Sequence, residues 1–504
     1  MKPSKRQQDV LTVWLKDTVN ILISAVAGSG KTSTLFLLLK TLKKKTLFLA
    51  FNKTIQTEIE SKMQDLDIKH GKSMTLHSLG LMSIKYSLPN NKIKVENGKN
   101  WRLLKELQNR AKTLYKKLPT YEEKQRLNFT LMDLNDMSRV YLTNDFKTLY
   151  KILTNMDKNP FQFEYLEQLW KLLLEIREAE YDTNNKTICI DFTDMIYLPA
   201  SRNFIIPTDP KILMIDECQD LSTMQHKLVD NLIKQGHVQR WIAVGDRNQA
   251  IYGFSGANSA SFDLFKEKDN VVELPLDICY RCPVDVVNYA NKVYDIMQPF
   301  KKHIGTVKHL GTEIDTIIDT ISQYPESMII CRNKGPLITM YFELISREIP
   351  CKLVGEDILT SLTRFLTPKQ NLTIRATTDQ LSNEFLKLSS NQRTDEERIK
   401  FYVFKENYEN YTKLISNFDL EPTQTIKELI EKVKKMFEGS SNSISLCTIH
   451  KSKGLEADTV FILNESLIPS KFAKSKEQLA QEQNLKYVAR TRAKENMYFI
   501  EIKD

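Results

Sequence analysis

Short runs of apolar residues alternate along the chain with longer stretches in which apolar residues recur at helical spacing. The runs are almost continuously apolar, which is typical of strands buried on both faces of a parallel sheet. In the first half of the chain they are Ile21–Ser24, Thr46–Phe51, Ile212–Asp216, Trp241–Gly245 and Val271–Leu274. In the second half they are Met328–Cys331, Lys352–Gly355, Ile444–Ile449, Thr459–Leu463 and Met497–Ile500. This pattern predicts an α/β fold with two parallel sheets.

Two long stretches lack such runs and are rich in polar residues at helical spacing. They extend from about Val95 to Lys186 and from about Asp357 to Ser441. We therefore predict two α/β cores, each interrupted by a mostly helical insertion. The predicted segments are 1–94 and 191–285 for the first core, 95–190 for its insertion, 286–356 and 442–504 for the second core, and 357–441 for a shorter insertion.

The composition narrows the class of protein. The 504 residues are 41% hydrophobic and 27% charged, as in globular proteins that fold in water. Because the chain contains no run of eighteen apolar residues and no apolar leader, we expect a soluble intracellular protein with no membrane span. Seven scattered cysteines fit a reducing compartment. The net charge of +9 is compatible with a nucleic-acid partner and does not require one.

A glycine-containing turn follows the first predicted strand. It runs from Ala25 through Gly28-Ser29-Gly30 to Lys31-Thr32 and leads into an apolar helical run. A strand, a glycine turn and a helix start together place backbone N–H groups around a phosphate. The residues predicted to hold a nucleotide here are Ala25, Gly28, Ser29, Gly30, Lys31, Thr32 and Ser33. The alternative is a plain turn between a strand and a helix, since alanine occupies the position of the usual first glycine.

An acidic pair, Asp216 and Glu217, ends another predicted strand. In a nucleotide site, Asp216 and the Thr32 hydroxyl would hold Mg²⁺, and Glu217 would orient and deprotonate the attacking water. An acidic strand end alone is more often a solvated loop. This prediction therefore depends on the glycine turn lying on a nearby strand of the same sheet.

Further motifs occur in order around these two. They are Gln7, Phe51-Asn52-Lys53, Thr75-Leu76-His77-Ser78, Asp191-Phe192-Thr193-Asp194, the segment from Gly245 to Ala257, Tyr280-Arg281, the segment from Thr448 to Glu456, and Glu482 to Ala493. With this set, the chain resembles the superfamily 1 helicases of the UvrD/Rep type, whose phosphate loop also begins with alanine. Within that family it looks most similar to the helicase part of F-box DNA helicases, and we expect neither an F-box nor a C-terminal nuclease.

The resemblance implies two tandem RecA-like P-loop cores that hydrolyse ATP with Mg²⁺. The residues implied in catalysis are Lys31, Glu217, Gln249, Arg281 and Arg492, the last supplied by the second core. Gln7 and Tyr280 would contact the adenine, and Glu456 the ribose. The residues implied in DNA contacts are Phe51, Asn52, His77, Tyr252, Phe254, Thr448 and His450.

The function implied is that of an ATP-dependent DNA helicase or single-strand translocase that moves 3′ to 5′ on single-stranded or tailed duplex DNA. Three departures from the family pattern are notable. Phe254 and Ser255 stand where the UvrD branch has tryptophan and arginine, Cys279 replaces an asparagine, and the second insertion is shortened. The first and third departures favour an alternative, an ATP-switched single-strand-binding remodeller that displaces proteins without processive unwinding. An RNA helicase is a third interpretation.

Overall fold

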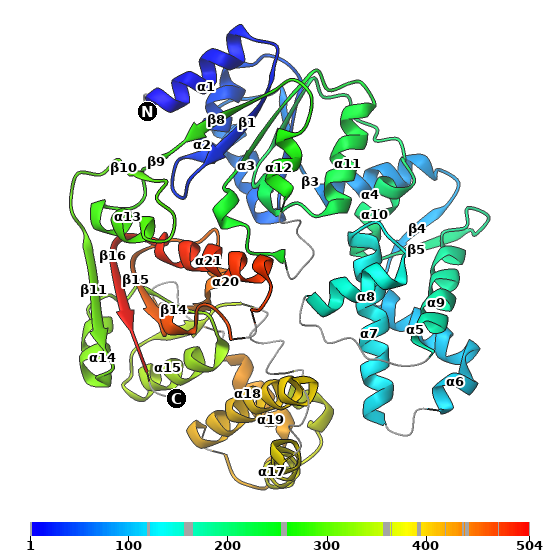
Figure 1. Ribbon diagram of the computed structural model, residues 1–504, viewed down its shortest axis with the longest axis vertical. Helices are drawn as coiled ribbons and strands as arrows, with labels where there is room; N and C mark the ends of the chain where they lie inside the picture. Colours follow the sequence, from blue (N-terminus) through cyan, green and yellow to red (C-terminus); the bar gives the residue numbers. More distant parts are fainter. Residues whose placement is uncertain are drawn as a thin grey trace. The chain divides into compact units, whose positions relative to one another are not determined.

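The computed structural model describes residues 3–117, 121–155, 165–253, 260–355, 363, 365–390, 395–418, 420–435, 438, 443–471 and 473–502. The chain forms two compact units, Met1–Asp277 (unit 1) and Ile278–Asp504 (unit 2). Each unit is built on a parallel sheet of six strands with helices around it (Figure 1). The predicted fold class, an α/β protein with two parallel sheets, is therefore confirmed.

The sheet of unit 1 has the strand order β3-β2-β6-β7-β1-β8, and all neighbouring strands are parallel. In that order the strands are Gly71–Thr75, Thr46–Ala50, Ile212–Ile215, Arg240–Gly245, Asn20–Ala25 and Val271–Leu276. Alternate residues of β1 pack into different apolar clusters, Leu22 into one and Ile21 and Ile23 into another. The strand is thus buried on both faces, which explains its continuous apolar run.

Helices cover both faces of this sheet. They are α1 (Lys5–Lys16), α2 (Lys31–Thr41), α3 (Lys53–Asp65), α4 (Leu76–Ser87), α10 (Phe192–Ser201), α11 (Thr223–Lys234) and α12 (Ser261–Lys266). Because the strands are parallel, their carboxyl ends and the starts of the following helices meet at one edge of the sheet. Apart from Gln7 in α1, many of the predicted site residues of unit 1 lie at or just after these strand ends.

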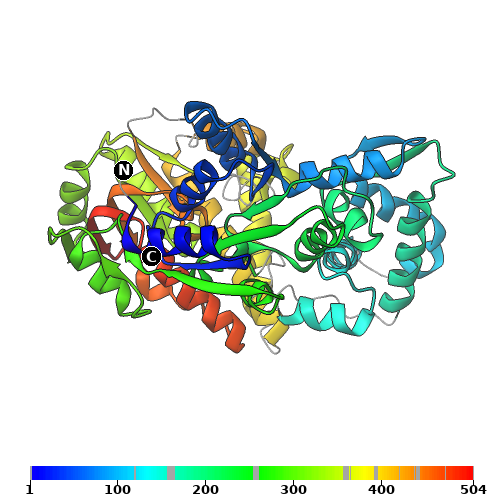
Figure 2. The same ribbon diagram turned by 90° about the horizontal axis from the view of Figure 1, so that it is seen from above.

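A helical insertion lies between α4 and α10 in the sequence. It contains α5 (Lys99–Arg110), α6 (Lys112–Lys116), α7 (Tyr121–Val140), α8 (Phe146–Asn155) and α9 (Leu166–Glu180), flanked by the paired strands β4 (Lys92–Val95) and β5 (Thr187–Ile190). Its helices bury an apolar cluster of their own around Trp170 and Leu107. Both views place these helices at one end of unit 1, away from α1 (Figures 1 and 2).

The sheet of unit 2 has the strand order β11-β16-β15-β12-β14-β13, again parallel throughout. In that order the strands are Thr306–Gly311, Ala493–Ile500, Ala457–Leu463, Met328–Cys331, Ile444–Thr448 and Cys351–Leu353, and a second pair is β9 (Ile278–Cys279) with β10 (Gln298–Pro299). The helices are α13 (Val284–Asn291), α14 (Ile314–Ser322), α15 (Lys334–Ser346), α17 (Ile374–Ser390), α18 (Asp395–Asn417), α19 (Ile426–Lys435), α20 (Ile449–Ser452) and α21 (Lys476–Arg490).

Each sheet has one strand more than the apolar runs predicted. The additional strands, β3 and β11, lie at sheet edges, where polar residues such as Lys72 and Lys308 are exposed. Val95, taken as the start of the helical insertion, instead ends β4. Among the described residues, no helix is both long enough and apolar enough to cross a membrane.

Candidate functional site

The glycine turn of unit 1 connects β1 to α2 directly. Ala25 ends the strand, and Gly30 caps the helix that begins at Lys31. Gly28 and Gly30 have φ values of +68° and +78°, a left-handed conformation that side chains disfavour. The Ser29 hydroxyl is buried and has no hydrogen-bond partner among the described residues. An unsatisfied donor beside a helix start suits a phosphate oxygen.

Lys31 and Thr32 meet the acidic end of β6. The Lys31 Nζ lies 2.8 Å from a carboxylate oxygen of Glu217, and the Thr32 hydroxyl donates to Asp216 Oδ2 at 3.1 Å. Burial lowers the pKa of Lys31, but Glu217, Asp216 and Asp246 outweigh that effect and raise it. Lys31 is therefore held charged, on the same side of the sheet as the acidic pair.

Three carboxylates surround this single lysine. Burial, followed by the charge of Glu217, raises the pKa of Asp216 to about 6, and burial also raises the pKa of Asp246. Such an excess of buried negative charge is reduced by a cation. No group of three or more potential metal ligands occurs in the described part of the chain. The donor set instead fits Mg²⁺, which takes one or two carboxylates and completes its shell with water and phosphate.

Glu217 has a φ of +51°, in the left-handed region that non-glycine residues adopt at a cost. Gln219 holds it in place, because its Nε2 donates to Glu217 Oε2 at 2.7 Å and its Oε1 accepts from the Asp246 backbone N–H at 3.0 Å. Gly245 leaves room for Gln219 in this position, since a Cβ there would lie 2.5 Å from Gln219 Oε1. Neither Gln219 nor Asp246 is among the predicted site residues, although Asp246 lies in the Gly245–Ala257 segment and Gln219 follows the acidic pair by two residues.

Two glutamines complete the surroundings of the turn. Gln249 Nε2 donates to Asp246 Oδ2 at 2.7 Å, close to the carboxylates. Gln7 caps α1 with Ser4 and donates from Nε2 to the Thr34 hydroxyl at 3.1 Å. A Cβ on Gly30 would lie 3.5 Å from Gln7 Nε2, so Gln7 reaches the turn. The start of α1 thus places Gln7 beside the predicted phosphate site, and the segment after β7 places Gln249 there.

Aromatic side chains of unit 1 come together beyond the end of β2. The rings of Phe51 and Tyr252 are stacked, with centroids 6.1 Å apart and an interplanar angle of 13°. Asn52 accepts a hydrogen bond from the Ile55 N–H and caps α3. Phe254 and Ser255 lie outside the described residues.

A second aromatic pair lies where α4 and α10 begin. The rings of His77 and Phe192 meet edge-on with centroids 6.0 Å apart, and Phe192 is 57% exposed. Burial lowers the pKa of His77, so its imidazole is neutral near pH 7. Phe192 lies in the Asp191–Asp194 motif but is not among the residues predicted to contact DNA. An aromatic residue directly after a helix-capping aspartate was the available signal.

Unit 2 repeats this local arrangement after β14. Thr448 caps α20 as Thr75 caps α4, and a histidine follows two residues later in both places, His450 and His77. Burial, with Arg332 and Lys334 nearby, lowers the pKa of His450 to about 3. Both units therefore place a neutral imidazole in the first turn of a helix that follows a parallel strand.

Tyr280 and Arg281 lie between β9 and α13. The centroids of the Tyr280 and Phe300 rings lie 4.7 Å apart. The buried Tyr280 hydroxyl has no hydrogen-bond partner among the described residues. Arg281 donates to the Thr491 carbonyl at 3.0 Å and forms an ion pair with Glu456 at 2.7 Å. Glu456 also pairs with Lys494 at 2.9 Å. Unit 2 thus brings Arg281 and Glu456 together.

Arg492 directly precedes β16 and is 1% exposed. Within unit 2 it donates to the Val488 carbonyl at 2.9 Å, to the Leu455 carbonyl at 3.3 Å and to the Thr491 hydroxyl at 3.1 Å. Arg490, two residues earlier, forms an ion pair with Glu465 at 2.8 Å. Arg492 thus donates to carbonyl and hydroxyl oxygens of its own unit, and Arg490 pairs with a carboxylate.

Comparison with known proteins gives matches over most of the chain. The model of the UvrD/REP helicase N-terminal domain matches residues 4–270, and that of the UvrD-like helicase C-terminal domain matches residues 363–504. The F-box DNA helicase protein 1 of Schizosaccharomyces pombe is 24% identical over 94% of this chain and 55% of its own length. The ATP-dependent DNA helicase Rep of Buchnera aphidicola is 23% identical over 62% of this chain and 66% of its own length.

The chain thus spans between about half and two thirds of the length of these curated relatives. The first family model alone covers more than half of the chain, and the second covers the end of unit 2. The resemblance that the motifs indicated is confirmed, and the protein belongs to the UvrD/REP helicase family.

Proposed function

We propose that this protein is an ATP-dependent DNA helicase or single-stranded DNA translocase, moving 3′ to 5′. The observation that supports it most strongly is the joining of Lys31, Thr32, Asp216 and Glu217 at one edge of the unit 1 sheet. A lysine, a hydroxyl and two carboxylates behind a glycine turn are the parts that phosphoryl transfer from ATP needs.

In the proposed reaction Lys31 leaves Glu217 and binds the outer phosphates of ATP. Thr32 and Asp216 would hold Mg²⁺, which neutralises charge on the phosphate oxygens. Glu217 is then released to orient a water molecule and accept its proton. Gln249 lies beside Asp246, from which it can report the presence of the terminal phosphate to the segment that follows it.

The arginines of unit 2 are proposed to complete the site. Arg281 and Arg492 would stabilise the negative charge that develops on the transferred phosphoryl group, a role worth roughly 10³–10⁵ in rate in other NTPases. Arg492 would exchange at least one carbonyl acceptor for a phosphate oxygen. Hydrolysis then requires both units, and this requirement couples ATP turnover to domain movement. Tyr280 and Glu456 would contact adenine and ribose.

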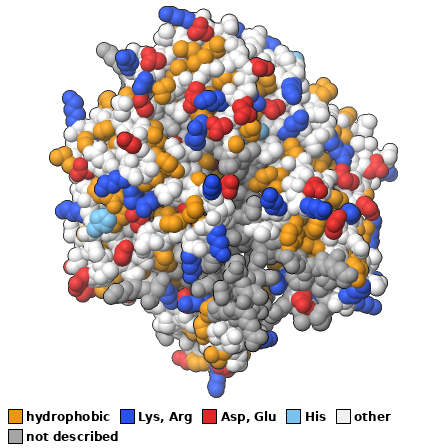
Figure 3. Space-filling model, in the orientation of Figure 1, with side chains coloured by type: hydrophobic (Ala, Val, Ile, Leu, Met, Phe, Trp, Pro, Cys, Tyr) orange, Lys and Arg blue, Asp and Glu red, His pale blue; other side chains and the backbone are white. Residues whose placement is uncertain are grey.

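Single-stranded DNA is proposed to contact both units. Phe51, Tyr252 and Phe192 offer rings for base stacking, worth on the order of 1–3 kcal/mol per base, and Phe192 is the most exposed of them. Thr448 and His450 lie at a helix start that suits backbone phosphates. On the face drawn in Figure 3, acidic and basic side chains are interspersed, so stacking supplements charge in this proposal.

ATP hydrolysis and strand separation by the purified protein test the proposal. We expect turnover stimulated by single-stranded DNA, loss of turnover in Lys31→Ala, and unwinding of 3′-tailed but not 5′-tailed duplexes. Stimulated turnover without unwinding, together with release of a protein bound to the strand, would support the remodeller instead. Turnover that is indifferent to DNA, or that survives Lys31→Ala, would contradict both.

A further inference from the structure

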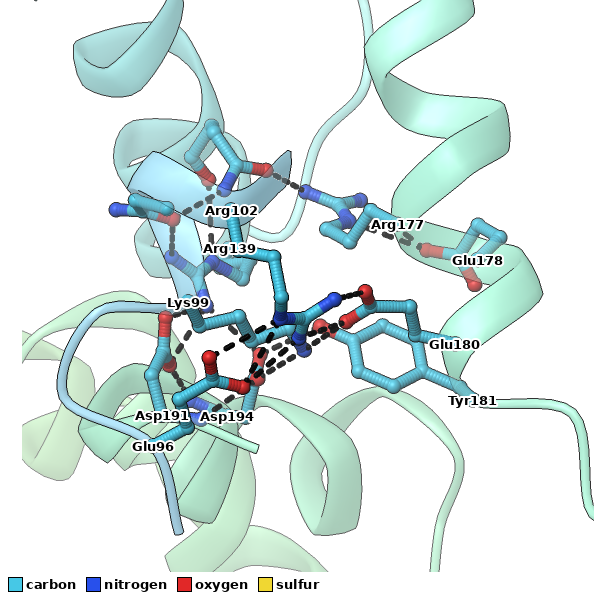
Figure 4. Close-up of polar contacts among 12 residues, drawn as sticks. Glu96, Lys99, Arg102, Arg139, Arg177, Glu178, Glu180, Tyr181, Asp191 and Asp194 are labelled. Atoms are coloured by element: carbon cyan, nitrogen blue, oxygen red, sulfur yellow. Dashed lines mark hydrogen bonds and ion pairs between the residues drawn. The ribbon is translucent and has the colours of Figure 1, made fainter. Parts of the chain in front are cut away.

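A cluster of buried charges joins the helical insertion to the start of α10. We call Lys99, Arg139, Tyr181, Asp191 and Asp194 the ionic cluster (Figure 4). Lys99 begins α5, Arg139 lies near the end of α7, and Tyr181 follows α9. The two aspartates form the capping box of α10. Three separate elements of the insertion therefore converge on one helix start.

Asp194 is the centre of the ionic cluster and is fully buried. Its Oδ2 accepts from Lys99 Nζ at 2.6 Å, and its Oδ1 accepts from Arg139 Nη1 at 2.7 Å and from the Tyr181 hydroxyl at 2.5 Å. The Asp191 backbone N–H donates to the same carboxylate at 3.0 Å. Every element that meets at this point is thus bound to a single side chain.

Arg139 and Lys99 are also fully buried and have further partners. Arg139 bonds both Asp191 oxygens at 2.7 Å and Asp136 at 2.6 Å. Lys99 lies 4.2 Å from the centroid of the Tyr181 ring. Burial opposes ionisation of Asp194, but Arg139 and Lys99 outweigh burial and hold the pKa of that carboxyl well below its usual range. Asp194 is therefore charged, and both of its oxygens accept hydrogen bonds.

A network of this kind contributes orientation more than stability. Buried ion pairs often stabilise a fold no better than apolar residues of the same volume, because removing the charges from water is costly. Their hydrogen bonds, however, require one arrangement of the groups that they join. An apolar contact would let the insertion slide on α10, whereas the bonds to Asp194 do not.

Phe192, the exposed ring beside His77, directly follows Asp191 and lies two residues before Asp194. The next turn of α10 is fixed as well, since α4 approaches it so closely at Gly80 that a Cβ there would lie 1.9 Å from the Met195 carbonyl oxygen. The ionic cluster is thus bound to the same first turn of α10 that carries the Phe192 ring.

We propose that Lys99, Arg139, Tyr181 and Asp194 are positioning residues for DNA binding, which hold the helical insertion and the Phe192 ring as one body. This inference rests on the proposed function. Single-stranded DNA that stacks on Phe192 then fixes the position of the insertion, and displacement of the insertion lowers the affinity for DNA. The ionic cluster acts on affinity for DNA and leaves the chemistry around Lys31 unchanged.

Two variants of different severity test this. Asp194→Asn removes the charge at the centre, and Tyr181→Phe removes one hydroxyl while the ring over Lys99 stays. Glu106→Gln is the matched control, because it breaks an exposed pair with Arg110 within the same insertion. The readouts are ATP turnover without DNA, the KM for ATP, and the concentration of single-stranded DNA that gives half-maximal stimulation.

We expect Asp194→Asn to raise the half-maximal DNA concentration about tenfold or more, because a small misplacement of a contact is costly. Tyr181→Phe should raise it by a smaller factor and, being mild, keeps the test valid if Asp194→Asn does not fold. Turnover without DNA and the KM for ATP should stay within twofold of wild type, as in Glu106→Gln.

A double variant separates positioning from plain destabilisation. If Tyr181 acts through Phe192, adding Tyr181→Phe to Phe192→Ala changes DNA stimulation no further. The positioning role would be overturned if the effects of Tyr181→Phe and Phe192→Ala multiplied in the double variant. It would also be overturned if neither Tyr181→Phe nor Asp194→Asn changed the half-maximal DNA concentration. In either case, a wild-type enzyme that DNA stimulates would still support the proposed function. A wild-type enzyme that DNA does not stimulate would overturn both.

Discussion

Asp216 shows at the scale of single residues how the site stores unfavourable electrostatics. Burial of its carboxyl, followed by the charge of Glu217, raises its pKa to about 6. An acid with a raised pKa in the folded state stabilises folding fully below its unfolded pKa, about 4, and that contribution is lost as the pH rises to about 6. Above this range the charged carboxylate lowers the free energy of unfolding, as expected for a group that binds a cation.

We therefore expect Asp216→Asn to make unit 1 more stable at pH 8, by roughly 1–3 kcal/mol, while abolishing ATP turnover. The gain should shrink at pH 4.5, where the wild-type carboxyl is protonated. Denaturant unfolding at the two pH values measures it. Asp65→Asn, at an exposed position of α3, controls for the loss of one charge. Equal stability of wild type and Asp216→Asn at pH 8 would contradict the electrostatic account.

Phe192 is an aromatic residue with 57% of its surface accessible, and it lies beside His77 at the starts of α10 and α4. Because a stacked base contributes on the order of 1–3 kcal/mol, Phe192→Ala should raise the half-maximal single-stranded DNA concentration by about 5–150-fold. Titration of ATP turnover with DNA checks this. Phe129→Ala, an equally large and 48% exposed ring of the insertion, should have little effect. Similar losses in both variants would argue against a specific contact.

At the scale of elements, the decisive packing is that of α4 on α10. Gly80 allows it, since its missing Cβ would clash with backbone 1.9 Å away. Backbone cannot move aside as a flexible side chain can. The starts of both helices, and with them His77 and Phe192, depend on this approach.

Gly80→Ala should therefore destabilise unit 1 by about 3 kcal/mol or more, because the two helices must separate. Denaturant unfolding followed by circular dichroism measures the change. Gly98→Ala is the matched control, since nothing lies within 4 Å of its added Cβ. It should change stability by no more than about 0.5 kcal/mol. A Gly80→Ala variant as stable as Gly98→Ala would refute the close-packing argument.

The elements also show what the sequence could predict. Central strands such as β2 and β6 are buried along their whole length, so their apolar runs identified them. The edge strands β3 and β11 are partly exposed and carry polar residues, so no run marked them. Edge strands form because a neighbouring strand offers hydrogen bonds, which is information absent from local pattern.

The candidate site shows the same limit. Lys31, Thr32, Asp216 and Glu217 were predicted because their spacing is local and their chemistry is specific. Gln219 and Asp194 were not, because their roles arise from contacts between distant segments. Asp194 is a surface-type residue in sequence and becomes a buried centre only when three elements of the insertion fold against it.

At the scale of the whole molecule, each unit supplies part of the proposed machinery. Unit 1 carries the glycine turn and the acidic strand end, and unit 2 carries Arg281 and Arg492. Arg492 donates to carbonyl and hydroxyl oxygens of unit 2, and hydrogen bonds from a guanidinium to a phosphate are stronger than those to such neutral acceptors.

The central claim is that ATP hydrolysis by unit 1 requires Arg492 of unit 2, and the turnover number at saturating single-stranded DNA tests it most directly. Arg347→Ala, an exposed arginine of unit 2 paired with Asp315, serves as the control. We predict that Arg492→Ala lowers kcat about 10³-fold or more while Arg347→Ala leaves it unchanged. An Arg492→Ala enzyme that turns over ATP at the wild-type rate would contradict the account.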